Sequence, residues 1–210
     1  KERGYIFPKV VGWIRSKKDD LDIVKSLGLD EVGILMSCSD YHIYKKLNMD
    51  RKKAAKEYIK MVEKAFELGI KPRVHLEDIT RADIEHFVIP LVKATLWLSK
   101  QANIDVCFKL CDTLGLGVPF DFVSLPRSVP KLVHRIKSEC NLLPEQLEWH
   151  GHNDFYKAHD NAVCAWLFGA GIVNTTLKGI GERTGIAAFE AIISELLQIK
   201  WEEAPSLDLD

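Results

Sequence analysis

Two kinds of apolar pattern alternate along the chain. Short runs rich in β-branched and apolar residues are each followed by a longer segment in which apolar residues recur at helical spacing. Such alternation is typical of βα units and of a parallel sheet. The pattern predicts six strands, over residues 10–15, 31–36, 71–77, 105–111, 146–152 and 171–177.

The segments between these strands predict helices. The boundaries come from carboxylates and caps at the starts and from glycines at the ends, as with Asp19-Asp20 before Gly28 and Gly69 after the second helix. Residues 114–129 contain Gly115, Gly117, Pro119 and Pro126, so we expect an irregular loop that could serve an active site. The predicted helices are 19–28, 51–68, 80–102, 154–168 and 184–199.

Six parallel strands fit either a doubly wound sheet or six-eighths of a (β/α)8 barrel. The end of the first strand and the residues after it, Gly-Trp-Ile-Arg-Ser-Lys-Lys, lack the glycine-rich fingerprint of a dinucleotide-binding sheet. Polar residues instead follow several strands, and in a barrel those strand ends meet at one mouth. We therefore predict an α/β fold of the TIM-barrel type. Residues 1–199 form its catalytic domain, and the acidic, aperiodic segment 200–210 is a linker that leaves the barrel.

Composition narrows the class of protein. The chain has 210 residues, of which 47% are apolar, and 29 basic side chains nearly balance 30 acidic ones. With no basic cluster among aromatics, we expect small-molecule substrates and no nucleic acid. No apolar stretch approaches the ~20 residues that span a bilayer, and the N-terminus lacks a signal-peptide core. Five dispersed cysteines are typical of reduced thiols. We expect a cytoplasmic protein without membrane attachment.

The sharpest chemical signal is His150-Gly151-His152-Asn153-Asp154. In a strand, residues i and i+2 point to the same face about 7 Å apart, so both imidazoles could converge on one metal ion. The following Asn and Asp could cap the next helix or orient the ligands. The alternative is a pair of half-exposed strand histidines without a ligand, and the spacing alone leaves both interpretations open.

A second signal, Gly179-Ile180-Gly181-Glu182-Arg183-Thr184-Gly185, follows the last predicted strand and opens the last helix. Glycines expose backbone N–H groups, and a helix N-terminus attracts phosphate or carboxylate. Gly179, Gly181, Glu182 and Arg183 are therefore candidate substrate-binding residues. The alternative is a tight turn in which Glu182 and Arg183 are solvated surface charges.

Three further strand ends carry candidate side chains. His75 and Glu77 share one strand face, which makes Glu77 a candidate for proton transfer or for orienting a base. Thr113 could bind a substrate carboxylate through its hydroxyl group, and Ser37 and Ser39 add hydroxyls after the second strand. Turns and helix caps explain each of these residues equally well when it is taken singly.

Taken in order, these segments resemble one family. They are Ser-x-Ser-Asp-x-His (37–42), His-x-Glu-Asp (75–78), Cys-Asp-Thr (111–113), His-Gly-His-Asn-Asp (150–154) and Gly-Ile-Gly-Glu-Arg-Thr-Gly (179–185). The ordered set resembles the acyl-CoA-condensing metalloenzymes of the isopropylmalate synthase and homocitrate synthase family, which are (β/α)8 barrels. Residues 70–83 and 149–155 look most like the Re-type citrate synthases.

The resemblance implies a Claisen condensation of acetyl-CoA with a 2-oxo acid. Oxaloacetate giving citrate is favoured over 2-oxoglutarate giving homocitrate or 2-oxoisovalerate giving 2-isopropylmalate. His150 and His152 would bind a divalent ion (Mn, Mg, Zn or Co), Thr113 would hold the 2-oxo acid carboxylate, and Glu77 would belong to the proton-transfer machinery. The full-length protein would be a homodimer. An acyl-CoA lyase or aldolase of the same barrel family and a non-catalytic barrel that serves as a binding subunit are the alternatives.

Three departures from the family limit the expectation. The first barrel strand of the family supplies an Asp for the metal and a neighbouring Arg. This chain does not begin with Met, and its first strand corresponds to the third strand of the family's barrel. Ile186 stands where many members have Asn, and the family's catalytic His and Tyr from a region after the barrel have no counterpart here. We therefore expect about six of eight βα units, the first two missing, and a fragment that is inactive alone.

Overall fold

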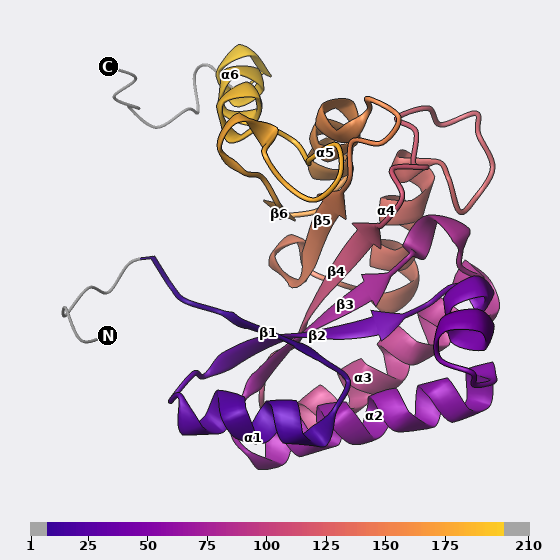
Figure 1. The fold of residues 1–210 in the computed structure, drawn as a ribbon. Helices are drawn as coiled ribbons and strands as arrows, with labels where there is room; N and C mark the ends of the chain where they lie inside the picture. Colours follow the sequence, from indigo (N-terminus) through magenta and orange to yellow (C-terminus); the bar gives the residue numbers. More distant parts are fainter. Residues whose placement is uncertain (1–7, 200–210) are drawn as a thin grey trace. The chain divides into compact units, whose positions relative to one another are not determined.

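The computed structural model describes residues 8–199. All six predicted strands are present, and they follow chain order in one sheet. The predicted α/β fold of the (β/α)8 type is confirmed, in the form of six consecutive βα units (Figure 1). The strands are β1 (Gly12–Arg15), β2 (Glu31–Ser37), β3 (Lys71–Glu77), β4 (Cys107–Asp112), β5 (Leu147–Gly151) and β6 (Ile172–Val173).

Helices alternate with these strands. Side-chain caps fix several helix starts: Asp50 accepts the Lys53 N–H at 2.7 Å before α2, and Ser128 precedes α4 in the same way. The α-helices are α1 (Lys18–Ser26), α2 (Arg51–Glu67), α3 (Ile89–Ala102), α4 (Val129–Cys140), α5 (Ala158–Leu167) and α6 (Phe189–Ile199). Shorter helical turns are the π-helices Tyr41–Lys46 and Ile84–Val88 and the 3₁₀ turns Ile79–Arg81, Pro144–Gln146 and Leu177–Gly179.

The chain forms two compact units. The described part of the first unit is residues 8–77 and 81–109, and that of the second is 78–80 and 110–199. In the first unit, α1, α2 and α3 lie along the same side of β1 to β3 (Figure 1). The parallel register of β2 and β3 places Ser37 opposite Glu77 at the carboxyl ends of both strands. This register assembles the first group of site residues.

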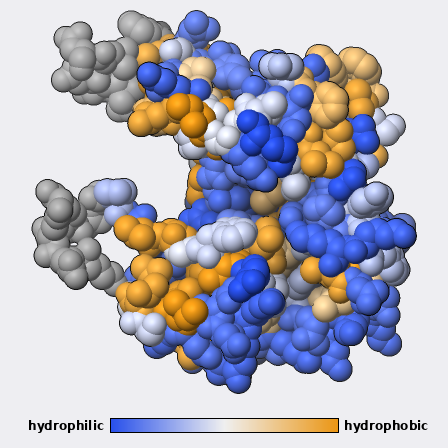
Figure 2. All heavy atoms as spheres, viewed as in Figure 1, coloured by the Kyte–Doolittle hydropathy of each residue, from blue (hydrophilic) through white to orange (hydrophobic). Residues whose placement is uncertain are grey.

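β1 is the edge strand of the first unit, and β2 is its partner there. Apolar side chains remain exposed along it and along the adjoining helix, and Figure 2 shows a hydrophobic patch in this region. These residues are Val10, Val11 and Trp13 beside Ile23 and Leu27. These exposed apolar side chains thus lie beside an edge strand, which carries unpaired backbone groups on its outer side.

In the second unit, α5 is the central helix. It packs against β5 and β6 and lies between α4 and α6. Asn161 of α5 donates to the Gly117 carbonyl at 2.9 Å, and Asp112 accepts the Leu116 and Gly117 N–H groups, both at 2.9 Å. The long connection from β4 to α4 is irregular, as predicted, and these bonds fix its first residues beside α5.

Three element predictions are wrong. Residues 80–102 are not one helix: the Asp83 side chain caps the π-helix Ile84–Val88, which leads into α3 with Pro90 in its first turn. The last helix begins at Phe189 rather than at Thr184, because the intervening residues turn back on themselves. β6 has two residues where seven were predicted. Threonines 175 and 176, which favour strands, lie outside it.

Two properties concern the chain as a whole. All five cysteines are buried as free thiols, in agreement with the predicted absence of a disulfide framework. Among residues 8–199, no helix combines the length and the apolar character needed to cross a bilayer. The predicted linker at 200–210 lies outside the described residues.

Candidate active site

Glu77 ends β3 in the first unit, and three side chains hold its carboxylate. The Lys46 ammonium donates to Oε1 at 2.7 Å and to Oε2 at 2.8 Å, the Ser37 hydroxyl donates to Oε2, and His42 Nδ1 lies 3.3 Å from Oε2. Burial raises the pKa of Glu77, but the hydrogen bonds from His42, Lys46 and Ser37 outweigh it and lower the pKa to about 2. At neutral pH, Glu77 is therefore an ionised acceptor.

Ser39 and His75 lie in the same unit. Ser39 is fully buried, and its hydroxyl oxygen accepts the His42 N–H at 3.2 Å at the start of the π-helix. The buried His75 ring lies over Gly33 of β2, where an added Cβ would come within 2.5 Å of Nε2. Gly33 thus provides the space for the ring. The structure joins Ser37 directly to Glu77 and links Ser39 to the same carboxylate through His42.

His150 and His152 form the core of the second unit's site. Their Nε2 atoms are 3.3 Å apart, and the rings meet edge to face with centroids 4.9 Å apart. The His152 N–H donates to the Asp112 carbonyl at 3.2 Å, which ties the end of β5 to the end of β4. Gly151 is required between the histidines, since a Cβ there would lie 2.9 Å from Trp149 Nε1. The strand spacing thus brings both nitrogens to one point.

This nitrogen pair fits two ligands of one cation. Two nitrogens about 2.1 Å from a shared ion, at an angle of roughly 100°, are about 3.2 Å apart. The Glu182 carboxylate lies 3.8 Å from His152 Nε2, beyond a coordination bond. No group of three or more His, Cys, Asp or Glu side chains suited to a metal occurs in residues 8–199. The described residues would therefore supply two ligands of a bound cation and leave its remaining positions to other groups.

Thr113 follows β4 in the second unit. Its Oγ1 accepts the backbone N–H of Asp78 at 2.8 Å, an arrangement that requires Asp78 at a positive φ of 62°. The Thr113 hydroxyl makes only a long contact of 3.4 Å to the Cys111 carbonyl as donor. A hydroxyl that is fixed by an accepted bond and weakly used as a donor can donate to a bound carboxylate.

The loop 179–185 folds back over the end of β5. Arg183 donates to Asp154 at 2.8 and 3.1 Å and to the Thr113 carbonyl at 2.6 Å, and the Asn153 N–H donates to the Gly185 carbonyl at 2.9 Å. Gly185 has a φ of 85°, and a Cβ there would lie 1.9 Å from the Gly179 carbonyl oxygen. Arg183 therefore fastens the loop beside the histidine pair, and Gly179 and Gly181 form its hairpin.

Comparison with known proteins identifies the family and the fold. A family model described as HMGL-like matches residues 5–209. The chain belongs to the HMGL-like family. The predicted resemblance to the isopropylmalate and homocitrate synthases, and among them to the Re-type citrate synthases, is confirmed.

Two curated relatives of this HMGL-like chain are similar over most of its length. It is 53% identical over 199 residues to the citrate (Re)-synthase of Clostridium kluyveri, an alignment that covers 95% of this chain and 44% of the relative. It is 42% identical to the 2-phosphinomethylmalate synthase of Streptomyces hygroscopicus, covering 88% of this chain and 42% of that protein. The chain thus spans less than half the length of either relative.

A solved structure supports the fold alone. The HMG-CoA lyase from Acenitobacter baumannii, in complex with coenzyme A and 3-methylmalate, superposes with a TM-score of 0.76 at 20% identity. The superposition covers 98% of this chain and 65% of that one. Such a distant match shows that the HMGL-like chain shares the lyase's fold and does not assign it the lyase's reaction.

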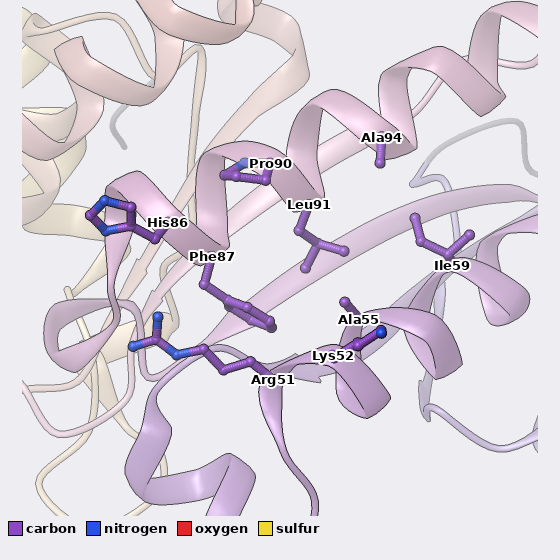
Figure 3. Close-up of a pocket in the computed structure, with 9 residues that line it drawn as sticks. All are labelled: Arg51, Lys52, Ala55, Ile59, His86, Phe87, Pro90, Leu91 and Ala94. Carbon is purple, nitrogen blue, oxygen red and sulfur yellow. The ribbon is translucent and has the colours of Figure 1, made fainter.

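The first unit also has a shallow pocket between α2 and α3 (Figure 3). Its walls are apolar, with Phe87 and Leu91 facing Ala55 and Ile59 across the groove. Arg51 at one end is already bound to Asp40 and Asp83. None of the predicted site residues lines this pocket, so it is separate from the Glu77 group.

Two features of the site were not predicted from the sequence: the contact of Lys46 with Glu77 and the hydrogen bonds that Asp112 accepts. Lys46 lies nine positions after Ser37, and no strand or α-helix period relates the two residues. The fully buried Asp112 accepts the Thr80 hydroxyl at 2.7 Å and two backbone N–H groups. The available signal was an aspartate before a loop with Gly115 and Gly117, because Asp side chains in turns accept hydrogen bonds from the backbone that follows them.

Proposed function

We propose that this chain is the metal-binding part of an acyltransferase that condenses acetyl-CoA with a 2-oxo acid. The observation that carries the proposal is the convergence of His150 and His152 Nε2, 3.3 Å apart, in a chain 53% identical to a citrate (Re)-synthase. A divalent cation bound there supplies Lewis-acid stabilisation of the negative charge that develops on the ketone oxygen.

The protein's own residues bind and orient the reactants. The Thr113 hydroxyl donates a hydrogen bond to the carboxylate of the 2-oxo acid, and the Asp78 N–H fixes its direction. Arg183 keeps the loop 179–185 closed beside the histidines, which limits the access of water. Glu77 is too weak a base, with its pKa near 2, to take a methyl proton unaided, so it orients the group that does.

Among 2-oxo acids, we propose oxaloacetate, with citrate as the product. The support is the higher identity to the citrate (Re)-synthase, 53%, than to the homocitrate synthase of Sulfurisphaera tokodaii, 30%. An acyl-CoA lyase or aldolase is the alternative, and the shared fold with an HMG-CoA lyase is its support. A role as a non-catalytic binding subunit is the other alternative.

The test uses the full-length protein with acetyl-CoA and, in turn, oxaloacetate, 2-oxoglutarate and 2-oxoisovalerate. We expect release of the CoA thiol with oxaloacetate and a metal content that falls in the His150→Ala variant. His134→Ala is the matched control, because His134 is an exposed histidine of α4 outside the site. Cleavage of a hydroxyacyl-CoA without condensation would favour the lyase. Bound substrate without turnover would favour a binding subunit.

We also propose that the full-length protein is a homodimer, as its family resemblance implies. Light scattering at micromolar concentration measures the mass directly. A monomer that is fully active at that concentration would contradict this proposal without affecting the proposed reaction.

A further inference from the structure

The π-helix Tyr41–Lys46 brings the side chains of His42 and Lys46 to Glu77. It follows β2 after a short turn, and its wide backbone turn is visible in the Leu47 N–H, which donates to the His42 carbonyl at 3.0 Å. His42 and Lys46 are four residues apart and share the face directed at β3. π-Helices are rare and concentrate at functional sites, because the extra residue re-aims side chains.

The two oxygens of Glu77 are used unequally. A carboxylate has about four lone-pair positions. Oε2 receives Lys46, Ser37 and the nearby His42 Nδ1, whereas Oε1 receives only Lys46 among the described residues. One acceptor position on Oε1 is therefore available to a bound molecule.

We propose that Lys46 is a positioning residue, which holds Glu77 as a carboxylate and fixes its rotation so that Oε1 accepts one hydrogen bond from a substrate or a water. This inference rests on the proposed condensation for its kinetic consequences. Its structural content, the charge state and orientation of Glu77, stands independently of the reaction.

The ion pair between Lys46 and Glu77 differs from an ordinary surface ion pair. Exposed pairs contribute little, since water solvates both partners when they separate. Here the Lys46 side chain is 46% exposed but that of Glu77 is only 11% exposed. Removing Lys46 therefore leaves a largely buried carboxylate with one neutral hydroxyl and one histidine, and burial then favours the protonated acid.

Other titratable groups also face Glu77. His42 belongs to the same π-helix, and Tyr58 of α2 donates to the Ser37 carbonyl at 3.0 Å. Burial raises the pKa of Tyr58, and the charge of Glu77 raises it further, so Tyr58 is neutral over the working pH range. His42 Nδ1 lies 3.3 Å from Oε2, so the contribution of His42 has to be measured separately.

The test compares Lys46→Met and Lys46→Arg with the matched control Lys45→Met in the full-length protein. Lys45 is the adjacent exposed lysine of the same π-helix. Infrared difference spectra against Glu77→Gln report the protonation of Glu77 without any substrate. Steady-state kinetics across pH, repeated in His42→Asn, separate the contribution of His42.

In Lys46→Met, we expect the pH midpoint for protonation of Glu77 to rise to about 4 or above. We also expect kcat to fall about tenfold and KM to stay nearly unchanged. Lys46→Arg restores both properties because it keeps a cationic donor, and Lys45→Met behaves as wild type. An unshifted protonation of Glu77 in folded Lys46→Met would overturn the inference. If Lys46→Met does not fold, a changed protonation midpoint in folded Lys46→Arg overturns it instead. Wild-type protein that makes no condensation product refutes the proposed function alone, since the infrared result still decides the role of Lys46.

Discussion

Two buried carboxylates, Glu77 in the first unit and Asp112 in the second, end their strands and have pKa values shifted in opposite directions. Cationic and hydroxyl donors lower the pKa of Glu77 to about 2. For Asp112, burial raises the pKa, and the opposing hydrogen bonds from Thr80 and from the backbone of Gly117 and Leu116 do not cancel it. Ionic donors therefore overcome the cost of burial where neutral donors do not.

The difference separates two kinds of site residue. Oε1 of Glu77 accepts only from Lys46 among the described residues, and the proposed role of this carboxylate is to accept a further hydrogen bond there. Asp112 is enclosed by its own loop and holds that loop through hydrogen bonds, whereas the proposed cation ligands are the histidines beside it. Each of the following variants tests this difference between the Glu77 group and the region around Asp112 and the histidine pair.

Removing the cation ligand should have the largest effect. We expect His152→Ala to lower turnover by roughly a thousandfold, because the Lewis acid supplies several kcal/mol of transition-state stabilisation. Elemental analysis should show loss of bound metal in parallel. His134→Ala should keep both metal and turnover, and metal retained in His152→Ala at wild-type stoichiometry would remove His152 from the ligand set.

Glu77→Gln should be the next most damaging change. We expect kcat to fall by about a hundredfold, within the range for proton-transfer residues, with the metal content unchanged. The combination distinguishes the two regions, since only the histidine variant should lose metal. Loss of metal in Glu77→Gln would show that the carboxylate acts on the cation rather than on the proton transfer.

The two carboxylates should give stability–pH profiles of opposite sign. The pKa of Glu77 is lowered, so its stabilisation, roughly 3 kcal/mol at most, is present above pH 4.5 and is lost as pH falls towards 2. The pKa of Asp112 is raised, so its contribution is present below pH 3.8 and is lost as pH rises through the higher folded pKa.

Urea unfolding of the wild type, Glu77→Gln and Asp112→Asn from pH 3 to 7 measures both slopes. Glu77→Gln should flatten the loss of stability on the acid side, whereas Asp112→Asn should steepen it. Parallel profiles for the two variants would mean that the surroundings of the carboxylates do not differ in the way described.

Removal of the Arg183 side chain, which holds the loop 179–185, should give the smallest effect. Arg183→Met removes the bonds to Asp154 and to the Thr113 carbonyl, and because Arg183 is partly exposed, we expect a loss of about 1 kcal/mol or less in unfolding free energy. Hydrogen exchange should accelerate at 179–185 and remain unchanged around Glu77. Faster exchange at Ser37–Lys46 would contradict the view that the Arg183 contacts act only within the second unit.

The sequence predicts the strands well and the last unit poorly. Short runs that contain apolar residues identify β2, β3 and β5 within a residue or two, because strands of a parallel sheet are buried on both faces. β6 and the start of α6 fail, since the glycines at 179, 181 and 185 let the chain form a hairpin that no helical period reveals. In this segment, backbone conformation determines the structure and hydrophobic pattern does not.

The candidate site shows a similar division. The pairing of His150 with His152 follows from strand alternation, and the sharing of a face by His75 and Glu77 follows from the same rule. Lys46 reaches Glu77 through a π-turn, and Arg183 reaches Thr113 across 70 positions. Contacts of that kind depend on tertiary structure and have no local signature.

The five buried thiols can report local unfolding, because a buried thiol reacts with an alkylating reagent only when its surroundings open. They lie in or beside β2, β4, α4 and α5 and are therefore distributed over both units. Burial also raises the pKa of the Cys164 thiol to about 11, which keeps its reactive thiolate scarce. Pulsed alkylation followed by peptide mass spectrometry would record, thiol by thiol, which layer of the molecule opens first. Because these thiols are buried, a thiol reagent in the assay of the proposed reaction should react mainly with released coenzyme A.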